Sequence, residues 1–346
     1  MDGNRLEALV ENSSLNEIES EKVDKSNAVG KRLILVDQAF SRLEKEFKDF
    51  SLSEAQNQVI ALIHFLIYAV ELAEQKGWIK EDIRSELLST WRIHGYSSFV
   101  KHIQTWPRGY QGDFEVINMI VDRQEESAGN TLGGVIGRYA LNSLIAQQHR
   151  EKLKIQADLV RDACRKFEAP NIISIASGSS RDLEEVQYEL KESKAQVLLI
   201  DFDNDALEES KRRLSGINNQ VYTFLTNVRK LPKFFKGLNE RGKKFHLIYA
   251  GGLFDYLPDS IIKIILKNLS DRFMHKDGIL MFTSIAKGNP YRAWIETMGN
   301  WRLIERSKEE MEQLLSCVHS REQSLKLDPT GLTWIARVHL DQIKLL

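Results

Sequence analysis

The chain has 346 residues and a formal net charge of −1. This length suits one large or two medium domains, and the balanced charge excludes the overall basic field that holds a nucleic-acid backbone. Two cysteines, Cys164 and Cys317, make neither a disulfide framework nor a clustered metal site, so we expect reduced thiols and a cytoplasmic protein.

Residues 1–30 are polar and acidic and contain no apolar core segment, so they do not form a secretory signal, and we expect a flexible tail there. The most apolar run is "VIALIHFLIYAV", residues 59–70. A membrane-spanning helix needs about 20 apolar residues. The run therefore indicates a buried helix, either a plain core helix or one that lines an apolar pocket, and we expect no stable membrane insertion.

Helical spacing dominates the chain up to residue 148. Apolar residues recur mostly at three- and four-residue intervals within two runs, which are Leu33, Val36, Phe40, Leu43, Phe47 and Val59, Leu62, Ile63, Leu66, Ile67, Val70. Residues 81–96 and 114–123 are predicted as further helices, and no strand is expected before residue 170. We therefore predict an all-helical domain over 31–148 that serves as a substrate-binding or lid domain.

From residue 149 the pattern alternates between helices and strands. After a helix over 151–167, the predicted strands are the apolar runs "NIISIA", "QVLLID", "QVYTFL", "FHLIYA", "GILMFTSI", "WRLIER" and "LTWIARVHL". Helical stretches at 182–192, 204–215 and 258–273 separate the earlier runs. This alternation predicts βαβ units. We expect an α/β, Rossmann-like sheet of seven strands over 149–346, mostly parallel with an antiparallel last strand.

The first predicted strand ends in the small residues Ala176, Ser177 and Gly178. In a doubly wound sheet the first strand-to-helix turn lies at the carboxyl edge, where small residues let backbone N–H groups approach a ligand. Asp201 closes the next strand, roughly 20 residues further on, where an acid binds ribose hydroxyls. The alternative role for Asp201 is a helix N-cap. The glycine pattern G-x-G-x-x-G of dinucleotide sites is absent, which favours a nucleoside without phosphates, namely S-adenosylmethionine (SAM).

These residues resemble the first motif of the class I SAM-dependent methyltransferases. In that motif an acid and an apolar residue precede G-x-G-x-G; here Ser174 replaces the acid, Ala176 the first glycine and Ser180 the third. The segments "FLTNV" and "FHLIYAGGLFDYLPD" resemble the family's adenine-contacting turn and its fourth-strand motif. The resemblance implies a cofactor site made of Ala176, Ser177, Gly178, Asp201, Phe202, Asn227, Val228, Ala250, Gly251 and Gly252.

A narrower resemblance covers almost the whole chain. The segments "WPRGYQGDFEVINMI", "ASGSSRDL", "FDYLPD" and "NPYRAWIETMGNWRLIERSKEEM" are similar to the bacterial extracellular-factor 3-hydroxypalmitic acid methyl ester biosynthesis protein family. Members of that family carry a helical domain before the methyltransferase domain. The resemblance implies methyl esterification of a fatty-acid-like or other small-molecule carboxylate.

The loop "TWPRGYQGDFE" is expected to join the two halves of the chain and is rich in large or polar-tipped side chains. Arg108 suits a carboxylate of either the cofactor or the substrate, and Tyr110 is placed to close over the sulfonium. We take Arg108, Tyr110, Asp113 and Tyr256 as catalytic candidates, with Arg138 as an alternative anchor. The other interpretation of the loop is a structural corner in which Arg108 pairs with an acid.

The eight histidines form no metal-ligand motif, and we expect no metal. A carboxylate acceptor is already ionised at pH 7 and needs no general base, whereas an amine or phenol does. The alternatives are an N- or O-methyltransferase of a polar metabolite and a non-catalytic SAM-sensing scaffold. Small molecules are the expected partners, nucleic acid is not, and a homodimer is left open.

Overall fold

The computed structural model describes residues 28–227 and 244–339, which form two compact units. Unit 1 contains the described residues up to Ala146 together with Pro290–Arg302, and unit 2 contains Gln147–Asn289 and the described residues from Leu303 onward. Most of the expected flexible tail lies outside the described residues, but residues 28–30 begin a helix. Pro290–Arg302 belongs to unit 1, whereas its sequence position predicts that it belongs to the domain spanning 149–346.

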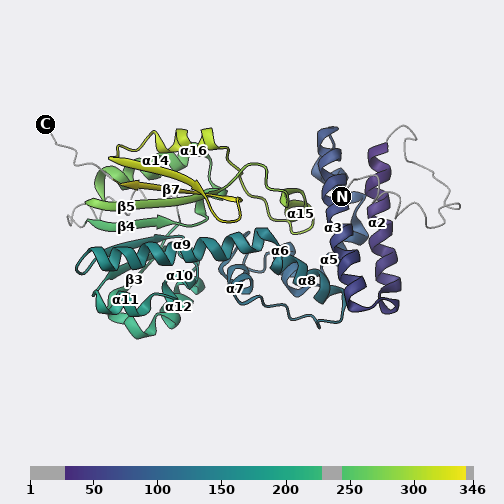
Figure 1. Cartoon of the computed structure of the whole chain (residues 1–346), viewed down its shortest axis with the longest axis horizontal. Coiled ribbons are helices and arrows are strands. Elements are labelled where there is room, and N and C mark those ends of the chain that lie inside the picture. Colours follow the sequence, from purple (N-terminus) through teal and green to yellow (C-terminus); the bar gives the residue numbers. More distant parts are fainter. Residues whose placement is uncertain (1–27, 228–243, 340–346) are drawn as a thin grey trace. The chain divides into compact units, whose positions relative to one another are not determined.

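Unit 1 consists of helices (Figure 1). They are α2 (Ala28–Glu46), α3 (Leu52–Gln75), α4 (Lys80–Ser85), α5 (Leu88–His94), α6 (Ser98–Thr105), α7 (Phe114–Asp122), α8 (Leu132–Asn142) and α15 (Arg292–Thr297), with the 3-10 turn η1 (Phe47–Asp49) and the first residues of α9 (Leu144–Lys166). The predicted helix over 81–96 is divided into α4 and α5. Helices α2 and α3 contact each other, and their periodic apolar residues are buried, as the sequence predicts.

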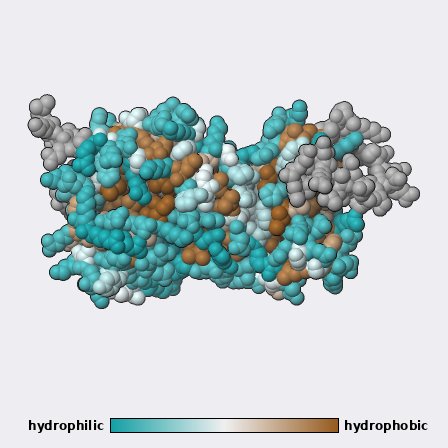
Figure 2. Space-filling model, viewed as in Figure 1, coloured by the Kyte–Doolittle hydropathy of each residue, from teal (hydrophilic) through white to brown (hydrophobic). Residues whose placement is uncertain are grey.

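Helix α3 contains the apolar run 59–70. It is the one helix in the described part of the chain that is long and apolar enough to cross a membrane, and half of its most apolar window is buried. Its outward side also carries apolar groups, since Ile60 and Tyr68 are exposed. Figure 2 shows hydrophilic side chains over most of the visible face and apolar residues gathered in patches. The inward residues of α3, such as Val59 and Leu66, belong to the core of unit 1, as expected for a core helix.

The Pro290–Arg302 segment is bound into unit 1 by polar contacts. Arg292 on α15 forms an ion pair with Glu74 on α3. The indole N–H of Trp294 donates to Nε2 of the buried His94, at 3.1 Å. Burial lowers the pKa of His94 to about 4, and its Nδ1 lies 2.8 Å from the Thr90 carbonyl oxygen. His94 is thus neutral, with the proton on Nδ1, which leaves Nε2 free to accept from Trp294.

Unit 2 contains a seven-stranded sheet with the order β3-β2-β1-β4-β5-β7-β6. The strands are β1 (Asn171–Ile175), β2 (Gln196–Asp201), β3 (Val221–Leu225), β4 (Phe245–Ala250), β5 (Met274–Ile285), β6 (Glu322–Leu327) and β7 (Thr333–His339). The first five strands are parallel, and β7 is antiparallel to both β5 and β6. The predicted sheet is confirmed, including its antiparallel end.

One predicted strand is wrong and one strand was missed. The run "WRLIER", residues 301–306, forms no strand; only Arg306 makes an isolated bridge, to Ala286. Trp301 and Leu303 in this run are apolar because they are buried in irregular structure. The missed strand is β6, an edge strand with mostly exposed residues, so it lacks the apolar pattern of a buried strand.

Helices cover both faces of the sheet (Figure 1). One apolar core lies between the sheet and α14 (Asp259–Arg272) with α16 (Lys308–Leu315). The other lies between the sheet and α9, α10 (Arg181–Glu184), α11 (Gln187–Glu192) and α12 (Asn204–Arg213). The remaining described elements are the 3-10 turns η2 (Ser215–Gln220) and η4 (Leu253–Tyr256). This layering leaves the strand ends as the place where loops can meet a ligand.

A buried arginine holds the loop after β4. The side chain of Arg306 is 1% exposed and donates to the backbone oxygens of Phe254 and Leu257, to Ser284 Oγ and to Asp259 Oδ1, at 2.7–2.9 Å. A guanidinium supplies five donors in a fixed fork, so one side chain fixes both ends of the η4 turn. Arg306 therefore sets the path of the chain that follows β4.

We expect Arg306→Met to lower the free energy of unfolding by about 3 kcal/mol or more, because truncation leaves the Phe254 and Leu257 carbonyls buried without their donor. Urea denaturation followed by circular dichroism measures this loss. The matched control is Arg321→Met, at an exposed arginine, which should change stability by less than about 0.5 kcal/mol. A loss below about 1 kcal/mol in Arg306→Met would contradict the role assigned to the guanidinium.

Candidate functional site

The turn after β1 has an unusual backbone. Ala176, Gly178 and Ser180 have φ of 53°, 53° and 54°, which is the left-handed region that side chains other than glycine rarely enter. These are the three positions at which the resembling motif has glycine. The sequence has replaced two of the glycines, but the backbone retains the conformation that glycine favours.

Asp201 fixes this turn from the end of β2. Its Oδ2 accepts from the Gly178 N–H at 2.9 Å, and its Oδ1 accepts from the Asp203 N–H at 3.0 Å. Burial raises the pKa of the Asp201 carboxyl, and the backbone N–H donors oppose that shift. The side chain is not the N-cap of α12, because Asp203 fills that position. The helix-cap alternative for Asp201 is therefore wrong.

The neighbouring strand ends carry further predicted cofactor residues. Phe202 directly follows Asp201 and is 49% exposed. After β3, the Thr226 N–H donates to the Asp201 backbone oxygen at 2.8 Å, and Asn227 follows as an exposed residue. Val228 lies outside the described residues.

The turn after β4 brings side chains from α9 close to the backbone. Ala250 is buried, and a Cβ at Gly251 would lie 1.6 Å from Nε2 of Gln156. Gly252 has φ of 102°, and its N–H donates to Thr283 Oγ1 at 3.0 Å. Only glycine at 251 leaves room for the Gln156 amide. Both glycines were predicted from the sequence. Gln156 was not, because nothing in the sequence of α9 indicates contact with this turn.

A second pair of residues that the sequence analysis missed joins β4 to the first turn. Tyr249 donates from its hydroxyl to Asp182 Oδ2 at 2.7 Å, and both residues are buried. Burial raises the pKa of Asp182 to about 6, although the hydrogen bond from Tyr249 acts to lower that pKa. The bond ties the segment after the left-handed turn to the neighbouring strand.

The catalytic candidates after β4 differ in their exposure. Tyr256 is 39% exposed, whereas the neighbouring Asp255 is buried and accepts from the Ile285 N–H at 2.8 Å. Burial raises the pKa of Asp255, and the charge of Lys152 lowers it. Asp255 thus has a structural contact of its own at the end of β5.

The strand ends of unit 2 fit an adenosyl ligand by two observations. The Ser177 hydroxyl is a buried atom with no hydrogen-bond partner in the part of the chain that is described, so a ligand atom can satisfy it. The left-handed turn also lies beside Asp201, whose carboxylate accepts from the Gly178 N–H. Ser177, Gly178 and Asp201 would hold the nucleoside there.

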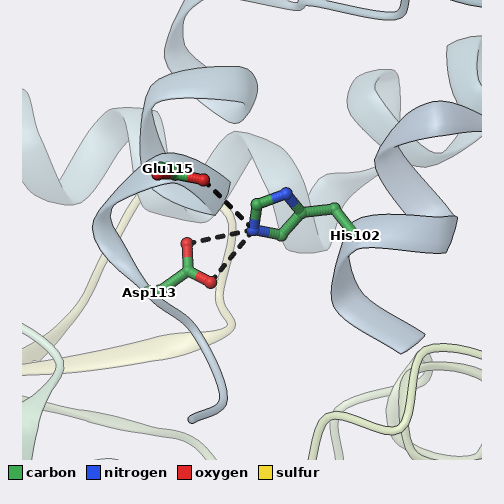
Figure 3. A group of neighbouring side chains, drawn as sticks. All are labelled: His102, Asp113 and Glu115. Atoms are coloured by element: carbon green, nitrogen blue, oxygen red, sulfur yellow. Dashed lines mark hydrogen bonds and ion pairs between the residues drawn. The ribbon is translucent and has the colours of Figure 1, made fainter. Parts of the chain in front are cut away.

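The predicted loop 106–113 does not join the two units, because it lies within unit 1 between α6 and α7. It is built around a histidine–aspartate pair (Figure 3). Nε2 of His102 lies 3.0 Å from Oδ2 of Asp113, and Asp113 also caps α7 by accepting from the Val116 N–H at 2.9 Å. Asp113 is 1% exposed. The hydrogen bond to Asp113 raises the pKa of His102, and burial opposes that shift.

Arg108 lies beside this pair. Its Nη1 is 3.2 Å from Oε1 of Glu115, and its guanidinium carbon lies 4.7 Å from the centre of the Phe114 ring. These contacts match the structural-corner interpretation of the loop. Tyr110 is half-buried in the same loop. A guanidinium has five donors, so a carboxylate ligand at Arg108 would share it with Glu115.

His102, Asp113 and Glu115 are also the one cluster of three potential metal ligands found among the described residues. Their ligand atoms lie within 4.8 Å of one another. Asp113 and Glu115 already have cationic partners in His102 and Arg108. The expected absence of a metal stays a prediction.

A cavity of about 400 Å³ lies in unit 1, between α3 and α8. Arg138, the alternative anchor, lines it together with Ile60, His64 and Tyr139. Arg138 donates from Nη2 to the Gly129 oxygen at 2.6 Å, while its Nε has no hydrogen-bond partner in the described chain. The cavity thus combines apolar walls with a guanidinium.

Neither protein-family models nor curated protein sequences match this chain. Among solved structures, a possible exported protein from Bordetella parapertussis is similar, with 14% identity, a TM-score of 0.57, and coverage of 85% of this chain and 98% of that one. Magnesium protoporphyrin IX methyltransferase from Synechocystis, with bound S-adenosylhomocysteine (SAH), has 12% identity, a TM-score of 0.41, and coverage of 57% and 86%. Geranyl diphosphate C-methyltransferase from Streptomyces coelicolor has 9% identity, a TM-score of 0.40, and coverage of 57% and 82%.

The Bordetella likeness covers most of both chains and concerns the fold alone. With its strand order and antiparallel β7, the sheet of unit 2 has the class I SAM-dependent methyltransferase fold.

Ala176→Gly should raise the free energy of unfolding by about 0.5–1 kcal/mol. A left-handed residue with a Cβ costs roughly 1–2 kcal/mol, and the greater chain entropy of glycine offsets about half of that gain. Urea denaturation checks the value. Ala163→Gly, within helix α9, is the matched control and should lower stability. If both substitutions lower stability equally, Ala176 is not strained.

His102→Gln should lower stability by about 1.5–3 kcal/mol at pH 5.5, the range for a hydrogen bond to a charged group. Because the pKa of His102 is raised in the folded state, its contribution is complete below the unfolded pKa of about 6.5 and is lost as pH rises through the folded pKa. Denaturation curves from pH 5.5 to 9 measure the difference from wild type. The exposed His319 provides the control, His319→Gln. A difference that grows with pH would contradict the charged pair, and stabilisation of wild type by Zn²⁺ would instead indicate a metal site.

Proposed function

We propose that this protein is a SAM-dependent methyltransferase that methyl-esterifies the carboxylate of a small, fatty-acid-like or similar acid. The observation that carries the proposal is the left-handed turn after β1 whose Gly178 N–H is bound by Asp201. It lies at the carboxyl edge of a parallel sheet, where such folds bind their ligands.

Asp201 retains the capacity to bind ribose. Each oxygen accepts one backbone N–H, and a carboxylate offers about four acceptor sites in all. In this proposal the free sites accept the two ribose hydroxyls. Phe202 offers its exposed ring to the adenine, and Asn227 follows the next strand. The tail of the cofactor would extend toward Gly251 and Gly252.

SAM supplies a methyl group activated by a sulfonium, and transfer is an in-line displacement. The task of the protein is then to orient both reactants and to exclude water. A carboxylate acceptor needs no general base at pH 7. The arrangement after β4 is consistent with this, because Asp255 is buried and bonded to the Ile285 N–H. Tyr256 is exposed and able to donate to an acceptor oxygen.

We further propose that the helical unit binds the acceptor. The cavity beside α3 and α8 has apolar walls for a hydrocarbon body and Arg138 for a carboxylate. One guanidinium binds an anion without the excess stabilisation that a cluster of cations would give the ground state. Arg108, which pairs with Glu115, is the second candidate for this role. A cytoplasmic location and the absence of a nucleic-acid partner remain part of the proposal.

Asp201→Ala should weaken SAM binding by about 1.5–3 kcal/mol, or roughly 10- to 150-fold in Kd, because the ribose loses a charged acceptor. Isothermal titration calorimetry of wild type and variant with SAM measures this. Asp205→Ala removes an exposed acid four residues further along and should bind like wild type. Unchanged SAM affinity in a folded Asp201→Ala variant would refute the ribose assignment, and no binding by wild type would refute the cofactor.

A further inference from the structure

Helix α9 carries a row of buried polar side chains. Gln148, Lys152 and Gln156 are spaced four residues apart, so they lie on one face of the helix. They are 0%, 4% and 5% exposed, respectively. Polar side chains of this length are seldom so buried unless a partner satisfies them.

The donors of this row lack acceptors in the described structure. Gln148 accepts from Thr333 Oγ1 at 2.6 Å, but its own Nε2 is buried without a partner. No hydrogen bond or ion pair joins the Lys152 ammonium or the Gln156 amide to any described residue. An ammonium carries three donors, and Nζ of Lys152 is not among the fully buried atoms that lack a partner, so it remains accessible at this site.

The acids nearest to Lys152 are committed to backbone groups. Asp255 accepts from the Ile285 N–H, and Asp328 accepts from the N–H groups of Leu332 and Thr333. Burial lowers the pKa of Lys152, and the charges of Asp255 and Asp328 only partly oppose this. Burying the ammonium is therefore unfavourable for the protein alone.

The row lies next to the turn after β4. A Cβ at Gly252 would be 3.0 Å from Nζ of Lys152, and one at Gly251 would meet the amide of Gln156. Gln148 reaches the start of β7 through Thr333. The donors thus line the carboxyl edge of the sheet from β4 to β7.

We propose that Gln148, Lys152 and Gln156 form a carboxylate-binding site, with Lys152 as its charged centre; the proposal deepens the methyltransferase function and rests on it for the identity of the ligand. A carboxylate fits because it is planar, has one charge and accepts several donors. A phosphate dianion fits less well, because Asp255 and Asp328 repel it and one ammonium supplies the only described positive charge of the row. Both the methionine tail of SAM and the acceptor acid carry the required group.

The test compares Lys152→Met with Lys154→Met, in which an exposed lysine paired with Glu151 is removed from the same helix. Calorimetry measures binding of SAH, of 5′-methylthioadenosine, which lacks the amino-acid tail, and of hexanoate with and without SAH. Urea denaturation without ligand provides a readout that is independent of binding. We expect Lys152→Met to be at least as stable as wild type, since it removes an unpaired buried charge, and Lys154→Met to bind all ligands normally.

If the site holds the cofactor tail, Lys152→Met weakens SAH binding by 10-fold or more and leaves 5′-methylthioadenosine binding unchanged. If it holds the acceptor, SAH binding stays normal and hexanoate binding is lost. The proposal is overturned if the variant binds all three ligands like wild type, or if it is destabilised while binding normally, since Lys152 then only balances Asp255 and Asp328. If wild type binds neither SAH nor 5′-methylthioadenosine, the proposed function fails, and only the hexanoate measurements then test the carboxylate site. If wild type also does not bind hexanoate, the site is overturned as well.

Discussion

The hydrogen bond from the Gly178 N–H to the Asp201 carboxylate is the contact on which the candidate site depends. It joins the turn after β1 to the end of β2 at the carboxyl edge of the sheet. It acts together with the bonds from the Ser177 N–H to the Ile200 oxygen and from Ser210 Oγ to the Gly178 oxygen, and these contacts hold Ala176 and Ser180 in the left-handed region. The strain is maintained by two buried neighbouring strands, which is how functional backbone conformations persist in folded proteins.

The buried parts of the fold were predictable from sequence, and the exposed or irregular ones were not. Strands β2 and β4 were predicted with their observed bounds, because a strand buried on both faces is an unbroken apolar run. The exposed edge strand β6 has no such run. "WRLIER" has one, since its Trp301 and Leu303 are buried in a loop, and apolar content alone does not distinguish the two cases.

The candidate site was predictable in part for the same reason. Small residues and an acid at strand ends follow a known spacing, which identified Gly178 and Asp201. Lys152 and Gln156 were missed because a polar residue on an amphipathic helix ordinarily faces solvent. Only the three-dimensional structure shows that this face of α9 is covered by the turn after β4. The loop around Arg108 was expected to join the two halves of the chain but lies within unit 1, and its ion pair with Glu115 depends on side-chain geometry that sequence does not encode.

Methyl transfer from SAM labelled in the methyl group tests the central claim most directly. Purified full-length protein is incubated with labelled SAM and a panel of short- and medium-chain carboxylic acids, amines and phenols, and products are identified by mass. The account predicts labelled methyl esters, which alkaline hydrolysis converts to labelled methanol, together with stoichiometric SAH. Label recovered only in SAM would contradict the enzymatic function, and label on an amine or phenol would contradict the carboxylate acceptor.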